Sequence, residues 1–199
     1  MKVIKNTINE NFRTVKIGSR TWTAENANID RFQNGDAIPK LPNFEAFNKL
    51  SVQKKPASYC YSLDPSCSKF GRFYNLWAVI DPRGFAPDGW SVPSAEDYQS
   101  LINAMGGTEQ AVARLRTSDG WPEVADPISA PTGFDAVATG HPATSKPDFF
   151  AAFFWTTSSV GEGKVYRNHA ILTASSGADL ARIGTQDGHE PLSVRFIAK

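Results

Sequence analysis

Turn-forming residues are spread along the whole chain and limit how long any helix or strand can be. The 199 residues include 15 glycines and 13 prolines, which interrupt helices and open turns. The chain also carries 13 Phe, 5 Trp and 5 Tyr, and such large aromatic side chains supply much of the buried area in a folded core. This combination predicts a fold of short elements and many turns rather than a helical bundle.

The length and the net charge of the chain limit the number of domains and the kind of partner. A chain of 199 residues is long enough for one complete core, which buries roughly 70% of the surface exposed by the unfolded chain. One large domain or two very small ones fit this length, and three do not; we expect a single domain over residues 1–199, with residues 1–13 as a lead-in. The 21 basic and 20 acidic residues argue against a nucleic-acid partner, because proteins that bind nucleic acids usually present a basic face.

The lengths of the hydrophobic runs show whether the sequence contains a membrane span or a secretory signal peptide. No stretch approaches the ~18 consecutive apolar residues of a membrane span, so we expect no membrane insertion. The first ten residues lack the apolar segment of a secretory signal peptide. A protein that acts outside the cell would therefore either have had its signal removed or leave the cell without one.

The two cysteines, Cys60 and Cys67, lie close together in the chain. In an oxidising compartment they could close a short loop as a disulfide, and two partly buried thiols are the alternative. The sequence does not decide between these states. Two cysteines with no nearby histidine cannot form a four-ligand zinc site.

Local patterns predict several short elements in the first half of the chain. In the segment 14–23, strand-forming residues flank a turn at Gly18 and Ser19, which predicts a hairpin. A short helix is expected at 43–50. The apolar run at 73–80 suits either a buried strand or a short buried helix, because its periodicity does not distinguish them.

The clearest helix begins at Ser94, where a capping hydroxyl is followed three residues later by the acid Asp97. Apolar residues then recur on one helical face as far as Met105, and Gly106 ends the helix. A second helix is expected at 108–116.

Strand patterns return at 153–157 and 192–197. The residues between them are rich in glycine and polar side chains, which is typical of loops and short strands. Two helices with strands on both sides predict an α+β fold with the two termini paired in one sheet.

The titratable residues form no recognisable catalytic or metal-binding motif. The histidines are His141, His169 and His189. Asp179, Asp187 and Glu190 could ligate Ca²⁺ through oxygen, although solvated loop acids are the interpretation that we favour. We therefore expect no enzyme activity, no metal and no cofactor.

Four of the five tryptophans lie next to apolar or turn residues. We expect Trp22, Trp77, Trp90 and Trp155 to pack in the core. Trp121 lies in a turn and is expected to form a partly exposed lid.

Five short segments occur in the order typical of one protein family. They are 15–26 (VKIGSRTWTAEN), 71–79 (GRFYNLWAV), 84–94 (GFAPDGWSVPS), 154–158 (FWTTS) and 193–195 (SVR). Each resembles a block of the Fibrobacter succinogenes major paralogous domain, whose members typically begin with VKIGxQxWMAENL. The resemblance extends over nearly the whole chain.

This resemblance implies a C-type-lectin-like fold, with paired termini, two helices and a long loop-rich region over a second small sheet. The same fold is used by formylglycine-generating enzymes and by the variable proteins of diversity-generating retroelements, which include phage receptor-binding proteins. Those variable proteins diversify exposed residues between the fourth and fifth blocks, which corresponds to 158–192 here. The copper-binding cysteine pair of the enzymes and the lectin calcium signatures have no counterpart in this chain.

We therefore expect a non-catalytic binding module on a phage virion, in a tail or fibre, or on a similar extracellular structure. Its partner would be a host cell-surface protein or glycan, or neighbouring virion subunits, and homo-oligomers fit this picture. A structural virion subunit without a ligand is the first alternative. A modified enzyme of the formylglycine-generating type is the second.

Two polar clusters in the window 158–192 are the expected ligand-binding residues, because they contain the Tyr and Arg that dominate binding hot spots. The first cluster is Tyr166, Arg167, Asn168 and His169. The second cluster is Arg182, Gln186, Asp187, His189 and Glu190. Trp121 and the loop 126–148 form the next candidate surface.

Overall fold

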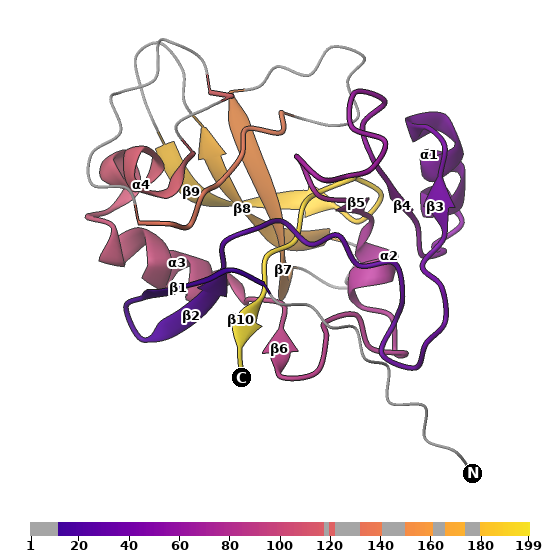
Figure 1. The fold of residues 1–199 in the computed structure, drawn as a ribbon, viewed down its shortest axis with the longest axis horizontal. Helices are drawn as coiled ribbons and strands as arrows, with labels where there is room; N and C mark the ends of the chain where they lie inside the picture. The colour runs from indigo at the N-terminus through magenta and orange to yellow at the C-terminus, as the bar shows by residue number, and fades with distance from the viewer. Residues whose placement is uncertain (1–11, 118–119, 122–131, 141–149, 161–165, 174–179) are drawn as a thin grey trace.

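A computed structural model describes residues 12–117, 120–121, 132–140, 150–160, 166–173 and 180–199 (Figure 1). Strands and helices both occur in these residues, so the α+β class is confirmed. In chain order the elements are β1 (Thr14–Ile17), β2 (Arg20–Thr23), β3 (Lys40–Leu41), α1 (Phe44–Val52), β4 (Ser58–Tyr59), β5 (Phe73–Tyr74), α2 (Leu76–Val79), β6 (Trp90–Ser91), α3 (Ala95–Ala104), α4 (Thr108–Leu115), β7 (Ala151–Val160), β8 (Tyr166–Thr173), β9 (Leu180–Asp187) and β10 (Ile197–Ala198).

The terminal sheet joins the beginning and the end of the described chain in the order β1-β2-β10-β6. Strands β1 and β2 form the predicted hairpin, in which Val15 lies opposite Trp22. On the other side of β2, Ile197 of β10 pairs with Trp22. The expected pairing of the termini is therefore confirmed, and Figure 1 shows these strands together at the lower edge of the fold.

The strand expected at 192–197 is only partly present, because β10 is two residues long. Leu192 and Ser193 instead form single bridges with Tyr74 and Phe154. Since these bridges lead to two different strands, the segment crosses between sheets and does not extend one continuous ladder.

Polar caps set where the helices begin. The Ser94 hydroxyl accepts the Asp97 N–H at 3.1 Å, and the Asp97 carboxylate accepts the Ser94 N–H at 3.0 Å, so α3 begins with the predicted capping box. The second predicted helix is present as α4. Asn43 caps α1 and Asn75 caps α2 in a similar way. Asn75 also divides the apolar run 73–80 into strand β5 and helix α2.

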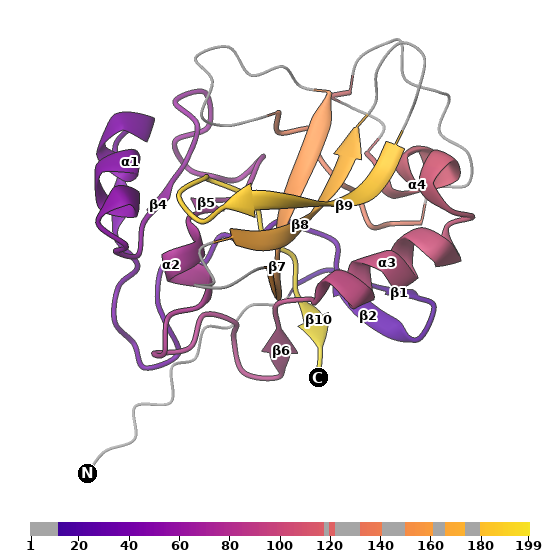
Figure 2. The same cartoon turned by 180° about the vertical axis from the view of Figure 1, so that it is seen from behind.

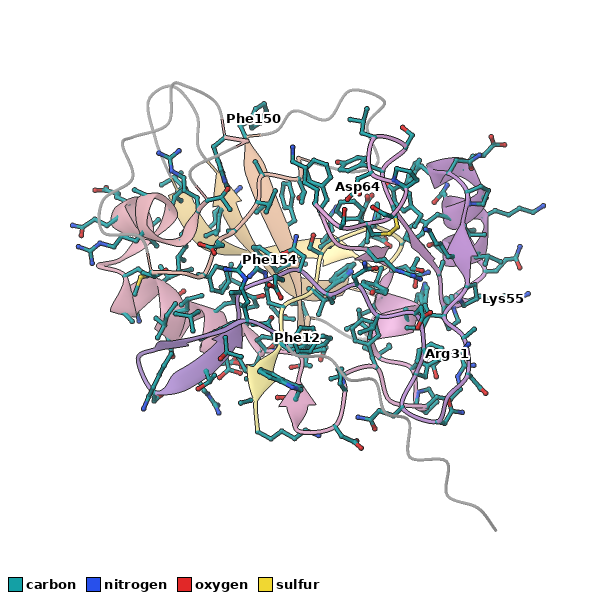
Figure 3. The ribbon with its side chains drawn as sticks, in the orientation of Figure 1. Phe12, Arg31, Lys55, Asp64, Phe150 and Phe154 are labelled. Carbon is teal, nitrogen blue, oxygen red and sulfur yellow. A yellow bond between two sulfur atoms is a disulfide. The ribbon has the colours of Figure 1, made fainter. Side chains whose placement is uncertain are left out.

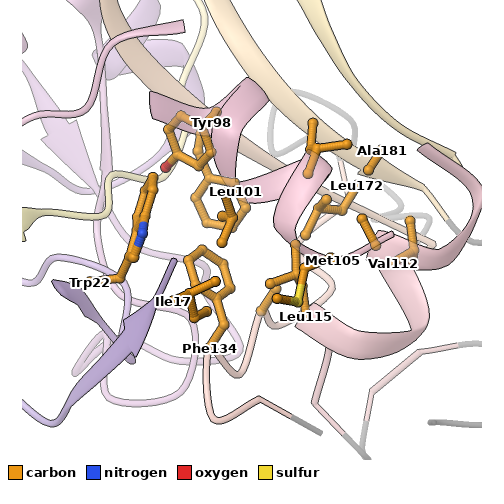
Figure 4. Close-up of a cluster of buried hydrophobic side chains, with 14 of the residues drawn as sticks. Ile17, Trp22, Tyr98, Leu101, Met105, Val112, Leu115, Phe134, Leu172 and Ala181 are labelled. Atoms are coloured by element: carbon orange, nitrogen blue, oxygen red, sulfur yellow. The ribbon is translucent and has the colours of Figure 1, made fainter. Parts of the chain in front are cut away.

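An antiparallel sheet in the order β7-β8-β9 lies at the centre of the molecule, and α3 and α4 pack against it (Figure 2). Phe154 and Leu172 of the sheet join Leu101 of α3 in a buried cluster that Figure 4 shows. Trp155, the next residue along β7 from Phe154, packs in a second cluster with Tyr74. A third cluster lies between α1 and the small sheet β3-β4-β5.

The tryptophans divide into two groups. Trp22 and Trp155 are 1% and 0% exposed, as predicted for core residues. Trp77 and Trp90 are only half-buried. Trp90 packs against the second cluster, whereas Trp77 belongs to none of the three clusters of described residues, so its assignment to the core was wrong. Trp77 lies on a four-residue helix at the surface, where only part of its ring is covered. Trp121 is also half-buried and packs against the first cluster.

Candidate functional site

A buried arginine joins segments that are far apart in the sequence. Arg195 is fully buried, and its Nε–H donates to Asn26 Oδ1 at 2.7 Å. Nη1 donates to the carbonyl oxygens of Thr23 at 3.0 Å and Phe134 at 2.7 Å, and Nη2 donates to the carbonyl oxygen of Asp135 at 2.9 Å. Burial lowers the pKa of Arg195 to about 10, so the guanidinium still carries its charge at neutral pH.

Other motif residues extend this network through the interior. Asn26 Nδ2 donates to the carbonyl oxygen of Phe70 at 2.9 Å. Gly71 follows with φ +73°, and a Cβ at this position would lie 2.6 Å from the Asn26 Cβ, so only glycine fits. Trp155 Nε1 donates to the Tyr74 carbonyl oxygen at 2.7 Å. The motif segments therefore form a scaffold by bonding to one another.

A disulfide closes the loop beside this scaffold. Cys60 and Cys67 are bonded, which decides between the two states that the sequence left open. Inside the loop, the Asp64 carboxylate accepts the backbone N–H groups of Lys69 at 2.8 Å and Phe70 at 3.1 Å. Burial alone would raise the pKa of Asp64, but these hydrogen bonds and those from neighbouring serines outweigh it and lower the pKa.

A cleft of about 660 Å³ opens next to the disulfide loop. Its walls come from the chain at Phe12, from the loop that contains Asp64 and from the segment before β7; Figure 3 labels Phe12 and Asp64. The charged residues that line it are Arg13, Glu25, Lys69, Asp135 and Arg195. Among the residues that the structure describes, none of those predicted to bind a ligand lines the cleft. Asp135 does belong to the loop 126–148 that the sequence suggested as the next candidate.

An ion-pair triad crosses this cleft. Arg13 Nε lies 2.6 Å from Glu25 Oε1, and Arg13 Nη1 lies 3.2 Å from Asp135 Oδ2. The Arg13 side chain is 64% exposed, so these pairs contribute little to the free energy of unfolding. Asp135 adopts φ +52°, a left-handed conformation that is uncommon outside glycine, and Arg195 holds its carbonyl oxygen in place.

A second surface surrounds a half-buried tryptophan. We define the Trp77 face as Lys54, Trp77, Asp187 and His189. Trp77 Nε1 donates to the Ser51 carbonyl oxygen at 3.0 Å, and Lys54 Nζ lies 5.8 Å from the Trp77 ring centroid. On another side, the ring centroids of Trp77 and His189 are 6.3 Å apart. His189 Nδ1 lies 2.7 Å from Asp187 Oδ1, so an aromatic ring, a cation and a His–Asp pair meet here.

The β8–β9 ladder brings the two predicted clusters side by side. The register pairs Tyr166 with Asp187 and Arg167 with Gln186. Asn168 and His169 follow, opposite Thr185 and Gly184. The backbone of these β8 residues is described, whereas their side chains lie outside the described part of the structure.

This end of the ladder adjoins helix α2. The Leu76 N–H donates to the Gly188 carbonyl oxygen at 3.0 Å, and Figure 2 shows the end of β9 and the start of β8 beside α2. The backbone at the start of β8 therefore lies next to the Trp77 face.

The other predicted residues are more scattered. Arg182 is exposed on β9 but lies four residues before Gln186, a separation of about 13 Å along a strand. Glu190 is half-buried, and its N–H donates to the Asp187 carbonyl oxygen at 3.2 Å. Asp179, His141 and most of the loop 126–148 fall outside the described residues.

The sequence analysis missed Trp77 and Lys54 as surface residues. The signal was the cap at Asn75, because a helix beginning there turns Leu76 and Val79 inward and leaves Trp77 and Ile80 on the opposite side. Ile80 is indeed 39% exposed.

The described residues offer no metal-binding cluster, no free thiol and no membrane-spanning helix. They contain no group of three His, Cys, Asp or Glu side chains that could hold a metal ion. Both cysteines of the chain are joined in the disulfide, so neither offers a free thiol. No helix in the described ranges is long and apolar enough to cross a membrane.

One family model matches almost the whole chain. It describes the Fibrobacter succinogenes major domain and matches residues 15–197. No curated protein and no solved structure matches the chain. The matched range begins in β1 and ends in β10, and it includes all five motif segments, the scaffold around Arg195 and the Trp77 face.

Proposed function

Because the chain belongs to the Fibrobacter succinogenes major domain family, we propose that it is a non-catalytic binding module that recognises a host-surface ligand. We place it on a phage virion, in a tail or fibre, or on a comparable extracellular structure. The ligand is a cell-surface protein or glycan, and the contact surface is the Trp77 face together with the adjoining start of β8.

The observation that carries this proposal is the half-buried ring of Trp77, with Lys54 over the ring and the His189–Asp187 pair beside it. Tryptophan is enriched among the residues that dominate binding energy, because one ring covers a large area with few rotatable bonds. The hydrogen bond from Trp77 to Ser51 fixes the ring before any ligand arrives. A rigid aromatic anchor with polar neighbours suits recognition of a partner surface.

The arrangement of loops on the scaffold supports the same proposal. We assign the α+β fold to the C-type-lectin-like type on the basis of the family, the paired termini and the two helices α3 and α4. Between β7 and the last motif, β8 and β9 belong to the central sheet, and the turn that follows β9 carries His189. Binding residues are commonly found on such segments, because a rigid scaffold positions them.

The disulfide supports a place outside the reducing cytoplasm. Disulfides persist in secreted proteins and at virion and cell surfaces, where no thiol pool reduces them. The bond between Cys60 and Cys67 also leaves the chain without the free cysteine pair that an enzyme of the formylglycine-generating type would use. Oxygen-dependent oxidation of cysteine peptides by the copper-loaded protein would contradict the proposal of a non-catalytic module.

A binding screen with two matched variants tests the proposal. The labelled protein is applied to a glycan array and to a panel of whole bacterial cells, and each hit is repeated with Trp77→Ala and Trp90→Ala. Both tryptophans are half-buried and lie in motif segments, but Trp90 packs against the lead-in, 5.4 Å from the Phe12 ring. We expect Trp77→Ala to weaken binding by at least about tenfold, a typical hot-spot loss, while Trp90→Ala retains it.

Two results would contradict this assignment. Equal binding by Trp77→Ala and the unmodified protein would remove the Trp77 face as the contact surface. A protein that binds no cell or glycan but assembles into particles with other virion proteins would favour the structural-subunit alternative.

A further inference from the structure

We propose that the cleft beside the disulfide loop is a second binding site, which takes a small ligand carrying a carboxylate. Its volume of about 660 Å³ lies within the range of roughly 300–1,000 Å³ that is typical of small-molecule sites. The cleft shares no lining residue with the Trp77 face. The inference therefore stands independently of the proposed function.

The first reason is the positive charge of Arg195 in the wall of the cleft. The guanidinium donates to Asn26 and to three backbone carbonyl oxygens, none of which carries a charge that would neutralise it. Arg195 lines the cleft with its side chain fully buried, so its charge attracts an anion in the cleft through space and without direct contact.

The second reason is the ammonium group of another lining residue. Lys69 is exposed and lines the cleft, and its Nζ lies 5.1 Å from the Phe70 ring centroid. Within the described ranges, no carboxylate lies within ion-pair distance of it. Asp64, the acid nearest to it in the chain, instead accepts the backbone N–H of Lys69. The Lys69 ammonium is thus available to an anion.

The third reason is the balance of charge in the cleft. The described lining residues carry three cations, Arg13, Lys69 and Arg195, and two carboxylates, Glu25 and Asp135. Both carboxylates already pair with Arg13. The charges of exposed Lys69 and buried Arg195 are not paired with a carboxylate among these residues, so one ligand carboxylate would bring the site close to neutrality. A cationic ligand would instead have to displace Arg13.

Calorimetric titration with defined carboxylates tests this inference. The probes are glucuronate and N-acetylglycine, which carry the same group on a sugar and on an amino acid, and glucose serves as the neutral counterpart of glucuronate. We expect saturable binding of at least one carboxylate, none of glucose, and weaker binding as NaCl rises from about 0.05 M to about 0.5 M. The probe that binds more tightly identifies the source of the carboxylate.

Two lysine variants provide the matched comparison. Lys69→Met should weaken carboxylate binding about tenfold, the loss of one charge-assisted hydrogen bond. Lys54→Met removes an exposed lysine that also lies over an aromatic ring, but on the Trp77 face, and should leave carboxylate binding unchanged. Both positions are exposed, and unchanged melting temperatures would show that both variants are folded.

The inference is overturned if neither carboxylate binds, if glucose binds as well as glucuronate, or if the two lysine variants behave alike. Trp77→Ala separates this inference from the proposed function, because it should retain carboxylate binding. Loss of cell binding with retained carboxylate binding would support two separate sites.

Discussion

The surroundings of Arg195 and of Trp77 show how the same motif segments produce both an interior and a surface. Arg195 is fully buried, and the partners of its guanidinium are one amide side chain and three backbone carbonyl oxygens. Trp77 is half-buried and has one backbone partner, the carbonyl oxygen of Ser51. Its other neighbours are the side chains of Lys54 and His189.

This difference predicts which residues determine the stability of the fold and which determine ligand binding. When a side chain that donates to several buried carbonyl oxygens is replaced, those oxygens lose their hydrogen-bond donors. The substitution therefore raises the free energy of the folded state. A side chain that contacts other surface groups can be replaced while the scaffold remains folded. We therefore expect large losses of stability around Arg195 and large losses of binding around Trp77.

The largest expected effect on stability is that of Arg195→Met. Methionine fills a similar apolar volume but cannot donate to the carbonyl oxygens of Thr23, Phe134 and Asp135 or to Asn26. We expect the free energy of unfolding to fall by about 3–5 kcal/mol, measured by urea denaturation. A loss below about 1 kcal/mol would show that the buried network does not stabilise the fold.

Replacing Cys60 and Cys67 together by serine should have the next largest effect. The cross-link closes a short loop, and its removal should lower the free energy of unfolding by about 2–3 kcal/mol in the chain-entropy description. Because neither cysteine belongs to the Trp77 face, cell binding by the folded double variant should be unchanged. Lost cell binding at an unchanged melting temperature would instead assign the cysteines a functional role.

Gly71→Ala tests how closely two motif segments approach each other. The added Cβ would lie 2.6 Å from the Asn26 Cβ at φ +73°, so we expect a loss of about 1–3 kcal/mol. Gly89→Ala is the matched control, because Gly89 has a similar φ of +83° but no heavy atom within 4 Å of the added Cβ. Equal losses would mean that the backbone angle alone, and not the contact with Asn26, requires glycine at position 71.

The smallest effect is the pH dependence contributed by Asp64. Its pKa is lower in the folded protein than in the unfolded chain, so its stabilising contribution is fully present above the unfolded pKa of about 3.9. That contribution is lost as the pH falls through the folded pKa. Asp64→Asn should therefore flatten the fall in stability below about pH 4, measured by urea denaturation at several pH values. An unchanged acid profile would contradict this role.

Local signals in the sequence were sufficient for much of the fold. The hairpin at Gly18 and the capping box at Ser94 depend on residues that are close in the chain, and both are present in the structure. The cleft depends on contacts between distant segments, which periodicity and capping do not encode. The two cysteines are close in the chain, but whether they are bonded depends on the redox compartment and not on a local pattern.

The candidate site was harder to predict for the same reason. Asp187 and His189 were expected from the composition of their segment, and the structure pairs them. Trp77 was placed in the core, because the apolar run was not divided at the Asn75 cap and the helix face that Trp77 occupies was therefore not identified. Only the pairing of α2 with the turn at Gly188 brings it next to His189.

A crossed comparison of Trp77→Ala and Trp155→Ala tests the central claim most directly. Each variant is measured for cell binding and for the free energy of unfolding. Trp155 is fully buried, so we expect its replacement to cost about 3–5 kcal/mol while the fraction that stays folded binds normally. Trp77→Ala should cost less than about 2 kcal/mol and lose binding. If Trp77→Ala lowers stability as much as Trp155→Ala and its folded fraction still binds, the division between scaffold and binding face is wrong.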